Sequence, residues 1–358
     1  MPSKQGTTRN LSESTPIGIR DVKAEDVLDI NSSSRKVCII DSGYDRSHED
    51  LPDDPTIVTG KSFVENDEAW YTDEITHGTH VAGTIVAIGG NTIGIKGIIR
   101  NGELKLHIVK AFGSSFGPTA SVIIAAIEDC VAEGSNVINM SFGGTERSDA
   151  YQDTIKAAHE KGVLIFAAAG NIGSPTYMYP ASYDHVTSVA AVDSDYRHIP
   201  FSNYNDKVDM SAPGSSVLST IPGNRYASYS GTSMACPHAT GVAALVWSNF
   251  PGFPADMLRT MLESSATDLP LNTDNGKDDK YGHGLINAKA AYDTVVDYLD
   301  DFNACDIGGK KMCNQANGCY WFPNQKQCYE CSRISDELNR GKNFCKRFGC
   351  IWNGSSCE

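Results

Sequence analysis

Four consecutive apolar residues meet a carboxylate and a glycine in the segment VCIIDSG, residues Val37–Gly43. A continuously apolar run of this length is typical of a strand that is buried on both faces, as in a parallel sheet. Open α/β sheets carry their chemistry at the carboxyl ends of their strands. The segment therefore predicts a buried strand that presents Asp41 at a functional edge.

Further apolar runs have the same character and alternate with amphipathic stretches. The predicted strands are Val37–Ile40, Leu104–Phe112, Asn136–Phe142, Val163–Ala169, Val186–Val192 and Val208–Ser211. The predicted helices are His77–Ile88, Ala120–Glu133, Asp149–Lys161, Ser233–Asn249, Pro254–Ser265 and Ile286–Leu299. Because strands and helices alternate over roughly 250 residues, we expect an α/β fold with a mostly parallel sheet and helices on both faces.

The eleven cysteines divide the chain, because only three precede residue 305 and eight lie between Cys305 and Cys357. In this last segment two similar units follow each other, each with a Gly-Cys pair and a tryptophan two residues later (Trp321 and Trp352). We therefore expect a leader at 1–11, a main domain at 12–300, a linker at 301–304 and a cysteine-rich tandem repeat module at 305–358.

The module holds too few apolar residues for a core of its own, so bonds made by its cysteines should stabilise its fold. Disulfides are one interpretation. A zinc site of Cys328, Cys331, Cys345 and Cys350 is the alternative, because the first two have zinc-finger spacing. Disulfides persist in oxidising compartments, so the first interpretation predicts a secreted, extracellular protein. Residues 1–10 contain no apolar signal core, so a signal was removed or there was none.

Charge and hydropathy exclude two classes of partner. The net charge is −14, with −17 in residues 1–304 and +3 in residues 305–358. A surface this acidic repels a phosphate backbone, so we expect no nucleic acid partner. No run approaches the ~18 apolar residues of a spanning helix, so we expect no membrane insertion.

Three polar residues stand where such a sheet could assemble a nucleophile. They are Asp41, His77 in the segment THGTHVAGT (Thr76–Thr84), and Ser233 in GTSMACPH (Gly231–His238). A serine hydroxyl needs a base, and a carboxylate can orient that base. Taken singly, each residue has a structural alternative, as a helix cap or a packed histidine.

The chain order Asp, His, Ser is that of subtilisin. The blocks around these residues resemble the subtilisin-like serine peptidases, the subtilase family. These blocks are DSG at 41–43, HGTH at 77–80, SFGG at 141–144, AAGN at 168–171 and GTSMA at 231–235. The resemblance runs from about Ser12 to Leu299. It implies a subtilisin-like fold, serine endopeptidase activity on protein or peptide substrates, and a propeptide inhibitor of which residues 1–11 are a remnant.

The resemblance implies a triad of Asp41, His77 and Ser233, with Asn171 as a donor in the oxyanion hole. A substrate peptide would pair as an added strand with two segments, Ser141–Gly144 and Gly113–Gly117. The expected substrate-binding residues are Ser141, Phe142, Gly143, Gly144, Phe112 and Met178. Because backbone pairing tolerates many sequences, we expect broad specificity, with an uncharged or hydrophobic residue before the scissile bond. Met178 at a pocket floor would make that pocket shallower. Met178 could instead point elsewhere, and a pseudoprotease that binds peptides without turnover is the alternative function.

A structural calcium ion is also implied, because Asp50 and the turn Gly89–Ile95 resemble the family's calcium loop. The expected ligands are Glu13, Asp50, Asn91, Ile93 and Ile95, all of which offer oxygen atoms. Solvated loop polars are the alternative. The acidic run Asp274–Asp279 is interpreted as a solvated loop.

The remaining cysteines and histidines of the main domain receive structural interpretations. Cys38 and Cys130 could pair, and Cys236 is expected to be a buried free thiol. His80 and His238 lie near catalytic candidates but are interpreted as packing or surface histidines.

Overall fold

The structure is a computed structural model that describes residues 5–8, 11–64, 66–67, 69–113, 117–269 and 276–303, and two short strands at 319–322 and 327–330. The chain divides into two compact units, Met1–Ala291 and Tyr292–Glu358. The domain boundaries expected at residues 11, 300 and 304 stay predictions.

A seven-stranded sheet forms the centre of the first unit, and every neighbouring pair in it is parallel. In spatial order the strands are β3 (Val58–Ser62), β4 (Lys105–Lys110), β2 (Lys36–Asp41), β5 (Val137–Met140), β6 (Leu164–Ala168), β7 (Val186–Val192) and β8 (Val208–Pro213). The expectation of a mostly parallel sheet is confirmed.

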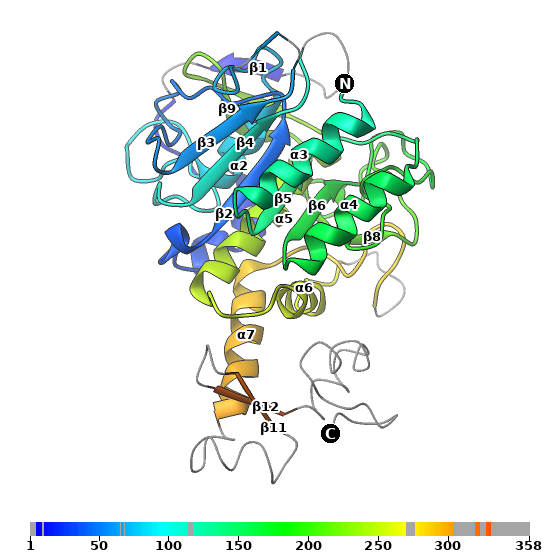
Figure 1. Cartoon of the computed structure of the whole chain (residues 1–358). Helices are drawn as coiled ribbons and strands as arrows, with labels where there is room; N and C mark the ends of the chain where they lie inside the picture. The colour runs from blue at the N-terminus through cyan, green and yellow to red at the C-terminus, as the bar shows by residue number, and fades with distance from the viewer. Residues whose placement is uncertain are drawn as a thin grey trace. The chain divides into compact units, whose positions relative to one another are not determined.

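Helices cover the sheet on both sides, as expected. The first unit contains the helices α1 (Ile17–Asp21), α2 (His77–Val86), α3 (Ala120–Ala132), α4 (Asp149–Glu160), α5 (Thr232–Asn249) and α6 (Ala255–Ser264), with 3-10 turns η1 (Ala24–Asp26) and η2 (Ser32–Ser34). In Figure 1, α3 and α4 lie in front of the sheet, and α2 and α5 lie behind it. The hydroxyls of Thr119 and Ser148 cap α3 and α4 by accepting backbone N–H groups.

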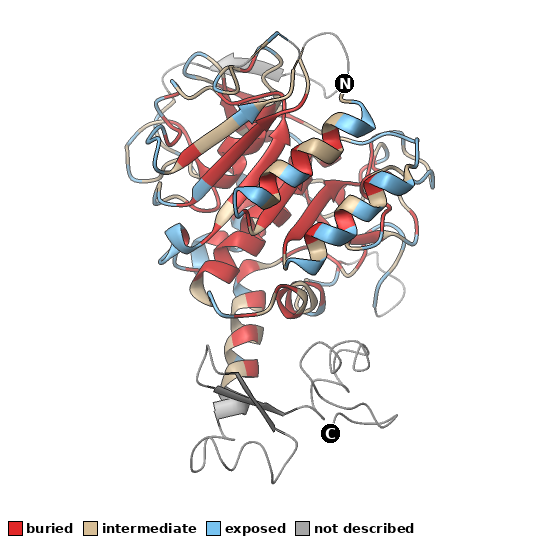
Figure 2. Ribbon diagram, viewed as in Figure 1, coloured by how far each residue is buried: buried red, intermediate tan, exposed pale blue. Residues whose placement is uncertain are grey.

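Burial follows this layering. Apart from the edge strand β3, the strands of the main sheet are almost wholly buried, whereas α3 and α4 bury one side and expose the other (Figure 2). The helix α5 is buried from Thr232 to Ser248 with a single exception, Ser233 in its first turn. A nucleophile candidate is thus a partly accessible residue at the start of a helix that is otherwise buried up to its last residue, Asn249.

Several elements differ from the expected pattern. The strand β3 was not expected, and the observed β4 and β5 are shorter than the predicted runs Leu104–Phe112 and Asn136–Phe142. An antiparallel sheet of β1 (Gln5–Thr8), β10 (Arg225–Tyr229) and β9 (Val217–Ile221) was also missed.

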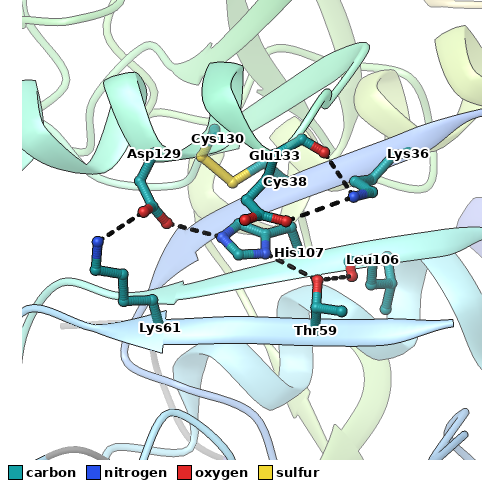
Figure 3. Close-up of a disulfide and its surroundings, with 9 residues drawn as sticks. All are labelled: Lys36, Cys38, Thr59, Lys61, Leu106, His107, Asp129, Cys130 and Glu133. Atoms are coloured by element: carbon teal, nitrogen blue, oxygen red, sulfur yellow. Dashed lines mark hydrogen bonds and ion pairs between the residues drawn. A yellow bond between two sulfur atoms is a disulfide. The ribbon is translucent and has the colours of Figure 1, made fainter. Parts of the chain in front are cut away.

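A disulfide joins the sheet to α3. Cys38 on β2 pairs with Cys130 on α3, both fully buried, which confirms the predicted pairing (Figure 3). His107 is the strand neighbour of Cys38, and its ring lies between Thr59 and Asp129 at 2.9 Å from each. Cys236 is a buried free thiol, as expected. The disulfide therefore fastens a helix to the strand that ends in Asp41.

The helix α7 (Ala288–Asn303) leads from the first unit into the second. In the second unit, β11 (Cys319–Phe322) and β12 (Gln327–Glu330) form an antiparallel hairpin. The zinc alternative, with Cys345 and Cys350, lies outside the described residues, as do Asp274 and Asn275 of the run Asp274–Asp279. None of the helices in the described ranges is long and apolar enough to cross a membrane.

Candidate active site

Asp41 and His77 meet where β2 ends and α2 begins. The ring Nδ1 of His77 donates to both carboxylate oxygens of Asp41, at 2.8 and 3.0 Å. Asp41 is fully buried and also accepts the backbone N–H of Ser42 at 2.7 Å, whereas the His77 side chain is 16% exposed. This contact fixes the ring and leaves Nε2 as the nitrogen that can accept a proton.

The electrostatic balance at His77 favours the protonated ring. Burial alone would lower the pKa of His77, but the charge of Asp41, its hydrogen bond to the ring and the charge of Asp73 together raise the pKa above its ordinary value. An imidazolium that forms here during proton transfer is therefore stabilised.

Ser233 occupies the second position of α5 and is partly exposed. Its hydroxyl donates to the backbone carbonyl of Ser141, just beyond β5, at 2.8 Å. Because a hydroxyl has one proton, Ser233 does not donate to His77 in this arrangement. Catalytic hydrogen bonds often form only when a substrate is bound, so the base contact requires rotation of this hydroxyl.

Asn171 lies three residues beyond the end of β6, and hydrogen bonds from Thr232 fix its side chain. The Thr232 backbone N–H and hydroxyl both donate to Asn171 Oδ1, at 2.8 and 3.0 Å. The same hydroxyl accepts the backbone N–H of Gly170 at 3.2 Å. Since Oδ1 is held by donors, the amide Nδ2 is the end left to face a ligand. Thr232 was missed by the sequence analysis, although it stands inside the block GTSMA.

The two expected substrate-binding segments meet at an aromatic contact. Phe112 and Phe142 pack edge to face with their ring centroids 5.8 Å apart. Gly144 exchanges both of its backbone hydrogen bonds with Tyr179, at 2.9 and 2.7 Å. The main chain of Gly144 is thus engaged within the protein, which leaves Ser141–Gly143 as the part of this segment that can pair with a peptide.

Met178 lies against two glycines of the family blocks. A Cβ atom on Gly170 would come within 2.6 Å of Met178 Cγ, and one on Gly143 within 3.7 Å of Met178 Cβ. Met178 itself is half-buried. Its side chain therefore lies beside Gly170, the residue before Asn171. The place of Met178 at a pocket floor stays a prediction.

The expected calcium ligands are close together. Asp50 is buried and accepts from Asn91 Nδ2 at 2.7 Å and from the Ile95 N–H at 2.8 Å. Glu13 accepts the N–H of Gly90 at 2.6 Å and forms an ion pair with Lys96 at 3.3 Å. In the part of the chain that the structure describes, no group of three or more His, Cys, Asp or Glu side chains could by itself hold a metal.

The electrostatics of this loop nevertheless suit a cation. Burial raises the pKa of Asp50 to about 6, hydrogen bonds from Ile95 and Asn91 lower it in part, and the charge of Glu13 raises it further. A buried carboxylate beside a second carboxylate is stabilised by a bound cation. The donor set of carboxylate, amide and carbonyl oxygens is also the one that Ca²⁺ prefers.

The other histidines of the site region are packing residues, as expected. His80 is buried, stacks on Tyr229 at 4.3 Å, and burial lowers its pKa to about 3. His238 is buried and bonds the Met234 carbonyl at 2.8 Å, and burial lowers its pKa to about 4. Burial raises the pKa of Cys236 to about 12, so its thiol stays protonated.

Comparison with known proteins agrees with this geometry. The family model described as the Subtilase family matches residues 32–284. Subtilisin DY of Bacillus licheniformis is 42% identical over 286 residues, which cover 78% of this chain and 99% of that protein. Subtilisin E of Bacillus subtilis is 41% identical, covering 78% of this chain and 72% of the relative.

A solved structure is also similar. The crystal structure of the psychrophilic subtilisin-like protease Apa1, from an Antarctic Pseudoalteromonas, matches with a TM-score of 0.73 and 30% identity. The match covers 81% of this chain and 99% of that one. The parallel sheet, the family match and these relatives lead to one conclusion: the chain belongs to the subtilase family and is a subtilisin-type serine endopeptidase.

Proposed function

We propose that this endopeptidase cleaves peptide bonds through Asp41, His77 and Ser233, with Asn171 in the oxyanion hole. The observation that carries the proposal is the double contact of His77 Nδ1 with the buried Asp41 carboxylate, at 2.8 and 3.0 Å. It selects the ring tautomer in which Nε2 is free to act as a base. The partly exposed second position of α5 then supplies the nucleophile.

The chemistry proceeds in two halves. Ser233 Oγ leaves its bond to the Ser141 carbonyl, transfers its proton to His77 Nε2 and attacks the substrate carbonyl carbon. Asn171 Nδ2 and the backbone N–H of Ser233, at a helix N-terminus, stabilise the oxyanion. His77 then protonates the leaving amine. In the second half, His77 takes a proton from a water molecule that attacks the acyl-enzyme, and then returns that proton to Ser233 Oγ as the acid product leaves.

Specificity follows from the walls beside Asn171. Met178 places an apolar side chain against Gly143 and Gly170, and this side chain narrows the room for the substrate side chain beside Asn171. An apolar wall of this kind favours an uncharged or hydrophobic residue before the scissile bond, and backbone pairing along Ser141–Gly143 tolerates many sequences. Cleavage-site profiling with a peptide library tests this preference. Frequent cleavage after Asp, Glu, Lys or Arg would contradict it.

Glu13, Asp50, Asn91 and the carbonyls of Ile93 and Ile95 would hold a structural Ca²⁺ ion. When bound, the ion neutralises the two carboxylates and ties the N-terminal segment to the loop after α2. It takes no part in bond cleavage. The backbone N–H of Ser14 already donates to the Gly94 carbonyl at 3.0 Å, so the two segments are adjacent without it.

We also propose that the protein is secreted, with a propeptide as its inhibitor and a C-terminal module at 305–358 that binds a surface or partner. The Cys38–Cys130 disulfide supports an oxidising compartment. The pseudoprotease alternative is not favoured, because the relatives are named as subtilisins and proteases.

Turnover of a chromogenic peptide by single variants tests the triad. Ser233→Ala should lower kcat by about 10⁶-fold, as in subtilisin itself, and His77→Ala should be nearly as severe. The double variant should be no slower than Ser233→Ala. Ser121→Ala is the matched control, because Ser121 is the exposed second residue of α3. Near wild-type turnover by Ser233→Ala would refute the triad.

A further inference from the structure

Asp73, in the loop before α2, is buried, with only 5% of its surface exposed, and its carboxylate accepts four hydrogen bonds. Its Oδ1 accepts the Ser42 hydroxyl at 2.8 Å and the Thr76 N–H at 2.9 Å. Its Oδ2 accepts the N–H and the hydroxyl of Thr79, at 2.8 and 2.7 Å. All four donors are neutral groups, so the charge of Asp73 is held in place without being cancelled by them.

These bonds organise the first turn of α2. Thr76 precedes the helix with φ of 74° and its side chain makes no capping bond. The free N–H groups of a helix start need acceptors from elsewhere. Asp73 accepts a hydrogen bond from the N–H of Thr79, and the Ser42 hydroxyl accepts one from the N–H of Gly78 at 2.9 Å. The helix that begins with His77 is therefore capped by Asp73 and Ser42 together.

Ser42 links this cap to Asp41. Its backbone N–H donates to the Asp41 carboxylate at 2.7 Å, and its hydroxyl donates to Asp73. The two elements also approach closely, since a Cβ atom on Gly78 would lie 2.2 Å from the Gly43 carbonyl oxygen. The chain of bonds Asp41, Ser42, Asp73 thus joins the end of β2 to the start of α2, the two places that carry Asp41 and His77.

We propose that Asp73 is a positioning residue that holds His77 against Asp41 and stabilises the imidazolium through its charge. This inference rests on the proposed function of His77 as the base. It assigns a second carboxylate to the site, one that touches neither the substrate nor the ring and that acts through Ser42 and the first turn of α2.

Further titratable groups stand on α2 and on the strands and helices near it. They are Asp41 on β2, Asp73 before α2, His80 on α2, Tyr229 on β10, and Cys236 and His238 on α5. Burial lowers the pKa of His80 to about 3 and of His238 to about 4, so both are neutral near pH 7. The Cys236 thiol is protonated there. Asp41 and Asp73 are thus the two carboxylates whose charges raise the pKa of His77.

A purely structural cap makes a different prediction from a positioning residue with an electrostatic role. Loss of a cap lowers stability but leaves the pH dependence of catalysis where it was. Loss of a nearby negative charge moves the titration of the base. The acid limb of the kcat/KM profile is therefore the readout that separates the two.

The experiment compares two substitutions at Asp73. Asp73→Asn keeps the size and removes the charge, so the acid limb of kcat/KM should move to lower pH while kcat falls about ten- to hundredfold. Asp73→Glu keeps the charge, so its acid limb should stay near that of the wild type even if kcat falls. An acid limb of Asp73→Asn that superimposes on the wild type, in a folded variant, overturns the proposal.

Two controls accompany these variants. Asp193→Asn removes a carboxylate that accepts the N–H groups of Asp195 and Arg197 in a remote turn, at 2.9 Å each. Its pH profile should match the wild type. If Asp73→Asn does not fold, Thr79→Val removes one donor and leaves the carboxylate, so kcat should fall with little change in KM. An unchanged kcat in folded Thr79→Val would then overturn the proposal.

Titration of the His77 ring by NMR separates this inference from the proposed function. In the Ser233→Ala background, Asp73→Asn should lower the pKa of His77 whether or not the wild type hydrolyses peptides. An inactive wild type with this shift would refute the proposed triad but support the role of Asp73 in orienting and charging the ring. An unchanged His77 titration in an active enzyme would refute the role of Asp73 alone.

Discussion

Thr232 holds the amide of Asn171 by two hydrogen bonds to the same oxygen, one from its backbone N–H at 2.8 Å and one from its hydroxyl at 3.0 Å. An amide whose oxygen is held in this way presents its NH₂ group in the opposite direction. In the oxyanion hole that we propose, the orientation of Asn171 would therefore be set before any substrate arrives, which is the condition for electrostatic stabilisation of a transition state.

Thr232→Val should lower kcat about tenfold with little change in KM, because it removes one of the two bonds that orient Asn171 and keeps the shape of the side chain. Asn171→Ala should cost more, about 10²–10³-fold in kcat. Steady-state kinetics on one peptide substrate measure both. Wild-type kcat in a folded Thr232→Val would show that the hydroxyl does not orient the amide.

The pH profile of kcat/KM should follow the protonation of His77. The base must be neutral, so activity should rise with pH through a pKa above the ordinary histidine value of ~6.5, since Asp41 and Asp73 outweigh burial. The raised pKa in the folded state also means that His77 contributes stability that is fully present below pH ~6.5 and is lost as pH rises through the folded pKa. A profile that is flat from pH 5 to 9, or an acid limb below ~6.5, would contradict this account.

Removal of calcium should lower the melting temperature, because only the folded chain brings Glu13, Asp50 and Asn91 together. Asp50→Asn should make melting insensitive to chelator. Asp54→Asn is the control, because Asp54 is an exposed carboxylate that accepts the Thr56 N–H and hydroxyl nearby. Unchanged melting of the wild type in excess chelator, with no metal found by elemental analysis, would exclude the site.

Loss of the Cys38–Cys130 disulfide should lower the free energy of unfolding by about 2–5 kcal/mol, because the bond closes a long loop between β2 and α3. The variant is Cys38→Ala with Cys130→Ala, compared in denaturant melts with Cys236→Ala, which removes a buried thiol without breaking a bond. If the double variant melts no earlier than Cys236→Ala, the disulfide does not stabilise the fold.

The strands that the sequence predicted are those buried on both faces, such as β2 and β7, whose apolar runs are continuous. β3 was missed because it lies at the sheet edge, where only Val58 of its five residues is buried. β1 was missed because it pairs with β10 across more than 200 residues, and its register is set by tertiary contacts. β9 and β10 were also missed, although they pair with each other as a local hairpin.

The site was predicted to the extent that its residues stand in recognisable blocks. Asp73 has no such signal, because a carboxylate three residues before Thr76 is common in loops and its partners Ser42 and Thr79 are brought to it by the fold. The bond from Ser233 to Ser141 depends on a side-chain rotamer, which no sequence pattern encodes. Geometry of this kind becomes visible only when the strand ends and helix starts are placed together.

Covalent labelling by a fluorophosphonate, with the labelled site located by peptide mass mapping, decides whether Ser233 is the nucleophile and His77 its base. We expect one adduct, on the peptide that contains Ser233, formed more slowly below the pKa of His77 and absent from Ser233→Ala. An adduct that persists in Ser233→Ala, or a folded wild type that is not labelled at all, would contradict it.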